Sequence, residues 1–187
     1  NWVFNEVCAN IKQWKAQNRQ ELQVSINTSP SHYFNLESNI TQWLNLLLDQ
    51  KISARSILLE VTENLLMEAN EMVSKKLFQF RQAGVDIALD DFGTGYSSIS
   101  YLKRFPTDFI KIDRSFVKSM TDVSNDKVLC EAIIVMANKL GIKVVAEGVE
   151  TQEQYDILKS MGCDYAQGYF IAKPLSKSDF ESFWERH

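Results

Sequence analysis

The sequence predicts an α/β fold in which parallel strands alternate with helices, as in a (β/α) barrel or a doubly wound sheet. Three observations lead to this prediction. Apolar segments of strand length alternate with amphipathic helical patterns along the whole chain. A glycine directly follows three of the helical patterns, where it can end a helix, at Gly84, Gly141 and Gly162. Strict alternation of this kind is typical of parallel strands joined by helical crossovers.

The expected elements follow one another without a linker. An amphipathic helix is expected to open the chain, because apolar residues recur there at helical spacing: Trp2, Val3, Phe4, Val7, Cys8, Ile11 and Trp14. Strands are expected at residues 22–27, 57–62, 85–90, 109–112, 144–147 and 165–170. Helices are expected at residues 37–50, 68–83, 97–104, 125–140, 152–161 and 178–186. We therefore expect residues 1–187 to form one domain without a second.

Composition narrows the classes of function. The 187 residues are 45% hydrophobic and carry a formal net charge of -4, which fits one globular domain with a sizeable core. No basic cluster is long enough to bind duplex DNA or RNA. Three cysteines without CxxC spacing, Cys8, Cys130 and Cys163, predict reduced, buried thiols in a cytoplasmic protein. No apolar run approaches the ~18 residues of a membrane span, so any membrane anchor of a parent protein would lie outside this segment.

Polar residues end several of the expected strands: Asn27, Glu60, Asp90 with Asp91, Lys111 and Glu147. The carboxyl ends of parallel strands meet on one face, where active sites are built. Several carboxylates within a few ångströms of one another would be costly unless cations neutralise them. Oxygen ligands favour hard ions such as Mg²⁺, Mn²⁺ or Ca²⁺.

Other kinds of site find little support. The two histidines, His32 and His187, lie in a loop and at the last residue, which disfavours zinc, non-haem iron and a Ser-His-Asp or Cys-His nucleophile. Neither a GxxxxGK loop nor a GxGxxG turn occurs, so nucleoside triphosphates and dinucleotide cofactors lose support.

Asp90-Asp91 and Lys111 have the most specific interpretations. An isolated pair of aspartates is usually a solvated turn, but this pair follows the apolar run 87–89 and therefore ends a buried strand. One of its carboxylates could bridge two metal ions while the other binds only the second. Lys111 lies between two isoleucines, and a lysine in a buried strand is best explained by a partner, either carboxylates or a metal-bound water.

Glu60 and Asn27 admit a structural interpretation as well. Glu60 and Thr62 share one face of their strand and Glu63 points to the other, so one glutamate could bind a metal while the second supports its surroundings. A single glutamate in a strand is also common at a sheet edge. Asn27 could equally well cap the turn into Ser29.

Six segments in order resemble the EAL family of bacterial cyclic di-GMP phosphodiesterases, and the resemblance covers nearly the whole chain. Any one segment would be weak support, whereas six at the right spacing are strong support. They are Ser25-Ile26-Asn27, Leu59-Glu60-Val61-Thr62-Glu63, residues 90–98 (DDFGTGYSS), Ile110-Lys111-Ile112-Asp113, residues 146–150 (AEGVE), and Gln167-Gly168-Tyr169 followed by Lys173-Pro174-Leu175.

The resemblance implies a TIM-like barrel of the EAL type that binds two Mg²⁺ or Mn²⁺ ions and hydrolyses cyclic di-GMP to linear pGpG. It implies that one ion is bound by Asn27, Glu60 and Asp90, and the other by Asp90, Asp91 and Glu147. Lys111 would hold the attacking water, with catalytic support from Glu63, Glu147, Glu150 and Gln167. Substrate contacts would come from Asn27, Asp91, Gln167 and Pro174. The loop at residues 92–98 is similar to one that couples metal binding and dimer contacts to activity, which implies a homodimer.

The resemblance also implies that the Glu-Ala-Leu segment should precede Asn1. We therefore expect the chain to be the C-terminal three-quarters of the domain, N-terminally truncated, with an incomplete barrel and weak activity by itself. One alternative is a non-catalytic cyclic di-GMP receptor or protein-interaction module of the same fold. Another is an unrelated Mg²⁺-dependent barrel enzyme, such as an enolase-type lyase with Lys111 as the base.

Overall fold

The computed structural model describes residues 2–17, 22–34, 39–67, 71–94, 102, 104–120 and 124–186. Its contacts divide the chain into two compact units, unit 1 at residues 1–111 and unit 2 at residues 112–187. The strand order, β1-β2-β3-β4-β5-β6, follows the order in the sequence. The pairs β1–β2, β2–β3 and β5–β6 are parallel, as the alternation of strands and helices requires.

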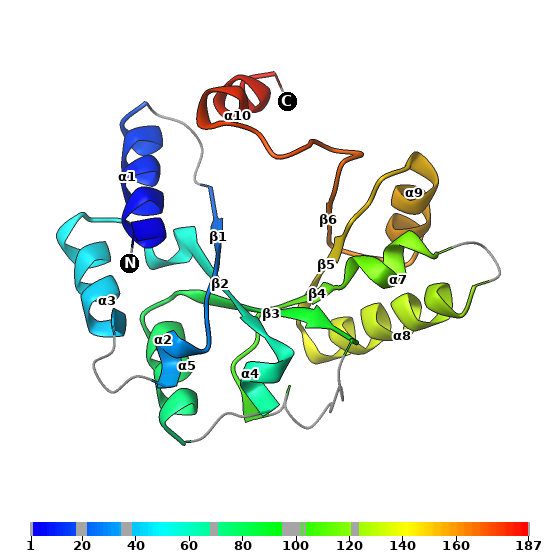
Figure 1. Ribbon diagram of the computed structural model, residues 1–187, viewed down its shortest axis with the longest axis horizontal. Coiled ribbons are helices and arrows are strands. Elements are labelled where there is room, and N and C mark those ends of the chain that lie inside the picture. Colours follow the sequence, from blue (N-terminus) through cyan, green and yellow to red (C-terminus); the bar gives the residue numbers. More distant parts are fainter. Residues whose placement is uncertain are drawn as a thin grey trace. The chain divides into compact units, whose positions relative to one another are not determined.

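Unit 1 packs helices against parallel strands (Figure 1). Its elements are α1 (Trp2–Ala16), β1 (Val24–Asn27), α2 (Ser31–Phe34), α3 (Asn39–Asp49), a 3₁₀ turn (Ala54–Ser56), β2 (Ile57–Thr62), α4 (Glu63–Met67), α5 (Glu71–Gln82), β3 (Asp86–Phe92) and β4 (Phe109–Ile112), whose last residue belongs to unit 2. The rings of Phe4 in α1 and Trp43 in α3 stack with centroids 4.4 Å apart. The first five residues of β2 are buried, so this strand forms the centre of the unit.

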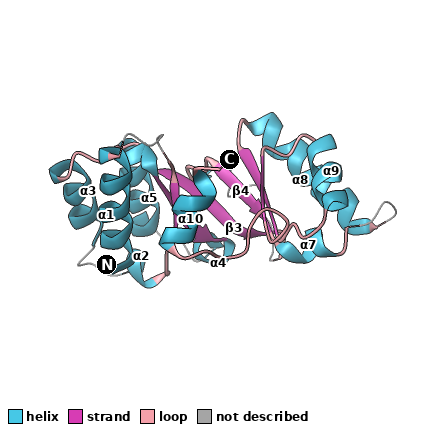
Figure 2. Cartoon of the chain, turned by 90° about the horizontal axis from the view of Figure 1, so that it is seen from above, coloured by secondary structure: helices cyan, strands magenta, loops and turns pink. Residues whose placement is uncertain are grey.

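Unit 2 contains α7 (Arg114–Lys118), α8 (Asn125–Leu140), β5 (Lys143–Glu147), α9 (Gln152–Ser160), β6 (Tyr165–Gln167) and α10 (Lys177–Trp184). Figure 2 shows α7, α8 and α9 grouped together in this unit. Ile134 and Ala137 of α8 are buried, as are Val144 and Ala146 of β5, which α8 contacts. Thr151 caps α9 by accepting a hydrogen bond from the backbone N–H of Gln154. The cap fixes the start of α9, shortly after the end of β5.

Several expected elements are confirmed with their bounds, namely the strands at 57–62 and 109–112 and the helix at 125–140. Gly84, Gly141 and Gly162 have φ of +92°, +72° and +82°, in the left-handed region that the expected helix ends require. The expected strand at 165–170 ends at Gln167 instead, because the backbone turns and Ile171 N–H donates to the carbonyl of Gly168. Most of the helix expected at 97–104 lies outside the described residues.

The cysteines are free thiols, as expected; Cys8 and Cys130 are fully buried, whereas Cys163, also expected to be buried, is only partly so. Burial raises the pKa of Cys8 to about 11 and the pKa of Cys130 to about 12, so both thiols stay protonated near neutral pH. Among the described helices, none is both long and apolar enough to cross a membrane.

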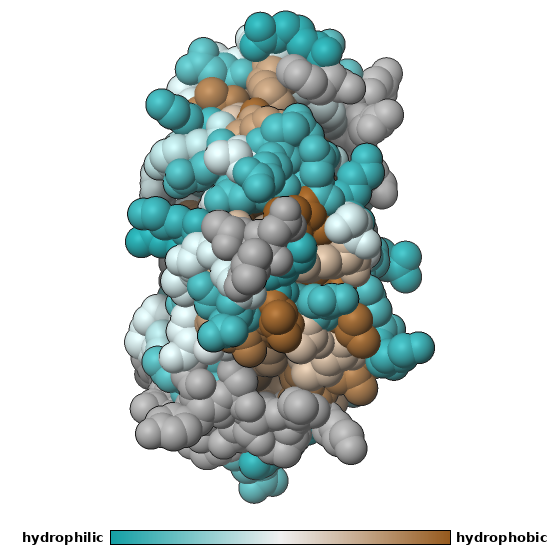
Figure 3. Space-filling view, turned by 90° about the vertical axis from the view of Figure 1, so that its right-hand side faces the viewer, coloured by the Kyte–Doolittle hydropathy of each residue, from teal (hydrophilic) through white to brown (hydrophobic). Residues whose placement is uncertain are grey.

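The surface that carries α8 is not uniformly polar. Figure 3 shows apolar residues between hydrophilic ones on this side of the molecule. On α8 the side chains of Val128, Leu129 and Val135 are exposed, Val128 by 63%. A contiguous patch of exposed apolar side chains is typical of a surface that contacts another protein, whereas single exposed apolar residues are common.

Candidate metal centre

The carboxyl ends of β1, β2 and β3 place three oxygen-bearing side chains on one face of unit 1. Asn27 pairs in register with Glu60, and Thr62 pairs with Asp90. Side chains two residues apart in a strand point to the same face, so Glu60 and Thr62 point the same way. Asn27, Glu60 and Asp90 therefore share a face, as their expected roles as ligands require.

Lys111 lies between two of these carboxylates. Its Nζ is 2.7 Å from Oε2 of Glu60 and 3.0 Å from Oδ1 of Asp90. The side chains of Lys111 and Glu60 are each 5% exposed, and that of Asp90 is 14% exposed. Of the two partners expected for Lys111, carboxylates or a metal-bound water, the structure shows the carboxylates. One ammonium group contacts two carboxylates, which leaves a net negative charge in a nearly buried place. A hard metal cation would be favoured there.

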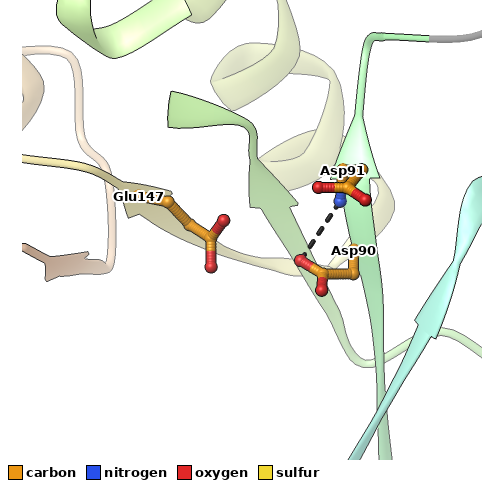
Figure 4. A group of neighbouring side chains, drawn as sticks. All are labelled: Asp90, Asp91 and Glu147. Atoms are coloured by element: carbon orange, nitrogen blue, oxygen red, sulfur yellow. Dashed lines mark hydrogen bonds between the residues drawn. The ribbon is translucent and has the colours of Figure 1, made fainter. Parts of the chain in front are cut away.

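Asp91 has an unusual backbone conformation. Its φ is +55°, in the left-handed region that aspartate tolerates better than most residues. The turn allows the backbone N–H of Asp91 to donate to Oδ1 of Asp90 at 3.1 Å, the dashed line in Figure 4. Thr94 closes the turn, since its hydroxyl donates to the carbonyl of Asp91 at 2.9 Å. Oδ1 of Asp90 thus accepts from two donors, Nζ of Lys111 and the N–H of Asp91. The exposed side chain of Asp91 does not follow the alternation of side chains along the strand.

Glu63 differs from its expected place. It does not continue β2 to the opposite face but begins the short helix α4, and its side chain is buried. The strand ends at Thr62, so the alternation assumed for Glu63 does not apply. Glu63 remains close in sequence to the candidate ligand Glu60, but the geometry of the helix sets the direction of its side chain.

In unit 2, two glycines allow the backbone around Glu147 to pack closely. Glu147 ends β5, as Figure 4 shows, is half-buried, and pairs in register with Gln167. A Cβ added at Gly148 would lie 2.6 Å from Cβ of Arg114, and φ at Gly148 is +70°. A Cβ at Gly168 would lie 2.1 Å from the carbonyl oxygen of Val149. Only glycine fits at either place. The close packing of the backbone that these glycines allow holds Gln167 beside the turn that follows Glu147.

A cleft of about 240 Å³ lies at this turn and is lined by Arg114, Glu147, Gly148, Glu150, Gln167, Gly168 and Tyr169. It brings together three residues expected from the sequence, Glu147, Glu150 and Gln167. Pro174, also expected to contact substrate, is exposed and does not line the cleft. Sequence reasoning missed Arg114. Its position two residues after the strand that carries Lys111 was the available signal, because such positions lie at the carboxyl end of a strand.

Comparison with known proteins identifies the fold. A solved structure described as the PaMucR phosphodiesterase in complex with c-di-GMP superposes with a TM-score of 0.88 at 33% identity, over 96% of this chain and 72% of that one. The complex of Klebsiella pneumoniae BlrP1 with manganese and cy-diGMP superposes with a TM-score of 0.78 at 33% identity, over 89% of this chain and 42% of that one. The expected TIM-like α/β fold is therefore confirmed.

The sequence comparisons agree. The cyclic di-GMP phosphodiesterase NbdA of Pseudomonas aeruginosa is 37% identical over 183 residues, which is 98% of this chain and 23% of NbdA. The chain thus spans less than a quarter of that relative's length. The sequence profile of the EAL domain matches residues 1–174. This match covers every residue that the candidate metal centre uses, and the chain belongs to the EAL domain family.

Proposed function

We propose that the protein hydrolyses cyclic di-GMP to linear pGpG with the help of two hard divalent cations, Mg²⁺ or Mn²⁺. The observation that carries the proposal is the group formed by Glu60, Lys111 and Asp90. In it, two carboxylates at the carboxyl ends of parallel strands both contact the buried ammonium group of Lys111. Membership of the EAL family supports cyclic di-GMP as the substrate and sets aside the enolase-type lyase as an alternative.

The donor set suits such ions. Asn27, Glu60 and Asp90 offer only oxygen ligands from one face of unit 1, and hard divalent cations prefer oxygen. We assign one ion to these three residues and the second to Asp90, Asp91 and Glu147. The manganese complex of BlrP1, which has a similar fold, supports the choice of a hard divalent cation.

The ions would supply a nucleophile from water at neutral pH and offset negative charge on the phosphoryl oxygens. Lys111 then orients the attacking water with the ammonium group that now contacts Glu60 and Asp90. Glu63, Glu150 and Gln167 support the site around the ligands. Asn27, Asp91, Gln167 and Pro174 contact the substrate in this proposal.

We further propose a homodimer. The exposed apolar side chains of Val128, Leu129 and Val135 on α8 support it, since a second copy would remove them from water. The loop at residues 92–98, which the family resemblance connects with dimer contacts, lies outside the described residues beyond Thr94. A cytoplasmic location stays a prediction of the sequence.

Hydrolysis is tested by incubating the protein with cyclic di-GMP and Mn²⁺ and separating the products by liquid chromatography. The assay uses residues 1–187 and the same residues preceded by a Glu-Ala-Leu strand. We expect Mn²⁺-dependent release of pGpG by the extended form and weak or no release by residues 1–187. Tight binding of cyclic di-GMP without turnover in both forms would contradict the proposal and favour a receptor.

A further inference from the structure

Thr28 makes an unusual pair of hydrogen bonds to the strand that carries Glu60. It directly follows Asn27, the last residue of β1, and is buried. Its backbone N–H donates to the carbonyl oxygen of Glu60 at 3.0 Å, and its hydroxyl donates to the same oxygen at 2.7 Å. Two donors from one residue therefore fix one peptide group of β2, at the point where Asn27 and Glu60 pair.

Tyr33 extends this pair into a chain. Its hydroxyl lies 2.9 Å from the hydroxyl of Thr28. Because the Thr28 hydrogen is directed to the carbonyl of Glu60, the Tyr33 hydroxyl is the donor to Thr28. Burial raises the pKa of Tyr33 to about 12, so its hydroxyl keeps the proton that it donates. Successive hydrogen bonds of this kind polarise one another in a buried environment.

The backbone of Tyr33 is held in turn by α5. Nζ of Lys76, a buried residue, donates to the carbonyl oxygen of Tyr33 at 2.7 Å. The chain of contacts therefore runs from α5 through α2 to the end of β1 and the middle of the candidate centre. At its far end, Glu60 contacts Lys111 with its carboxylate while its carbonyl oxygen accepts both Thr28 donors.

We propose that Thr28 and Tyr33 are positioning residues that fix the separation between Asn27 and Glu60 in the metal centre. The role rests on the proposed binding of a metal ion by Asn27 and Glu60. A cation needs its ligands within a few tenths of an ångström of the required distance, and a shift of β1 along β2 would move Asn27 but not Glu60. The hydroxyl of Thr28 opposes that shift, because its bond to the carbonyl of Glu60 breaks when the strands slide.

The test measures Mn²⁺ affinity by calorimetry and the thermal midpoint by circular dichroism for three variants. Thr28→Val removes the hydroxyl and keeps the shape, Thr28→Ser keeps the hydroxyl, and the double variant Thr28→Val with Tyr33→Phe removes both hydroxyls. We expect Thr28→Val to weaken Mn²⁺ binding about five- to tenfold, at or just below the lower limit of the roughly 10–100-fold effect of supporting groups. Thr28→Ser should bind Mn²⁺ within about twofold of the unaltered protein, because its hydroxyl can make the same bond.

The double variant separates positioning from stability. Thr28→Val leaves the buried Tyr33 hydroxyl without its acceptor, which lowers the thermal midpoint, and the added Tyr33→Phe removes that group. We expect the double variant to recover much of the midpoint while Mn²⁺ binding stays as weak as in Thr28→Val. Recovery of both, or a lower midpoint in Thr28→Val with unchanged Mn²⁺ affinity, would overturn the positioning role.

Asp90→Asn distinguishes this inference from the proposed function. If Asp90→Asn abolishes Mn²⁺ binding and Thr28→Val leaves it unchanged, the positioning role is wrong and the metal centre stands. If Asp90→Asn also leaves Mn²⁺ binding unchanged, the metal centre itself is wrong, and the positioning role with it.

Discussion

Replacing Lys111 by methionine is expected to destabilise the protein by about 3–5 kcal/mol when no divalent cation is present, the cost of removing one partner from a buried ion pair. Methionine keeps most of the volume of the side chain but removes the charge that lies 2.7 Å from Glu60 and 3.0 Å from Asp90. The two carboxylates would then face each other in a nearly buried place without a cation. Urea unfolding followed by circular dichroism, in the presence of a chelator, measures the loss.

Two comparisons show whether the loss comes from charge. The double variant Lys111→Met with Glu60→Gln removes one charge of each sign and should be less destabilised than Lys111→Met alone. Added Mn²⁺ should also restore part of the stability of Lys111→Met, because binding to the folded state stabilises it. Equal stability of the single and double variants, without any effect of Mn²⁺, would contradict the electrostatic account.

Replacing Asp90 by asparagine should reduce kcat for cyclic di-GMP hydrolysis by more than about 100-fold, since loss of a mere hydrogen-bond partner of a metal ligand costs roughly 10–100-fold. Asp90 is assigned to both ions, and its Oδ1 also holds the Lys111 ammonium group and the Asp91 N–H. The change removes a negative charge and keeps the size of the side chain. The extended form used in the hydrolysis assay gives the measurement.

Asp86→Asn is the matched control for this variant. Asp86 begins the same strand, β3, and its Oδ2 accepts a hydrogen bond from Nε2 of Gln23 at the opposite end from Asp90. The same loss of charge there should leave kcat within about twofold, because Asp86 lies outside the metal centre. Equal kcat in Asp90→Asn and the unaltered protein would refute the assignment of Asp90 as a ligand.

The parts of the fold that the sequence predicted well are those with a strong pattern. The buried run 57–62 could only be a strand at the centre of a sheet, and the structure gives it the same bounds. A lysine between two isoleucines needs a partner, either carboxylates or a metal-bound water, and the contacts of Lys111 with Glu60 and Asp90 show the carboxylates. Burial in the strand was sufficient to require a partner, but not to choose between these two.

The rest depended on geometry that periodicity does not report. The helices α4 and α7 have five residues each, too few for a helical repeat to be visible. The left-handed conformation of Asp91 follows from the turn closed by Thr94, which no pattern of apolar residues encodes. The pairing of Thr28 with Tyr33 was also invisible, since it requires the end of β1 and α2 to be placed together.

Diffraction from crystals grown with Mn²⁺, measured at the manganese absorption edge, tests the central claim most directly. We expect an anomalous peak in contact with oxygen atoms of Asn27, Glu60 and Asp90, at the carboxyl ends of β1, β2 and β3. Bond lengths should fall near the roughly 2.0–2.6 Å of hard cations with oxygen ligands. A peak elsewhere, or none at saturating Mn²⁺ with Lys111 still holding both carboxylates, would contradict the proposed metal centre.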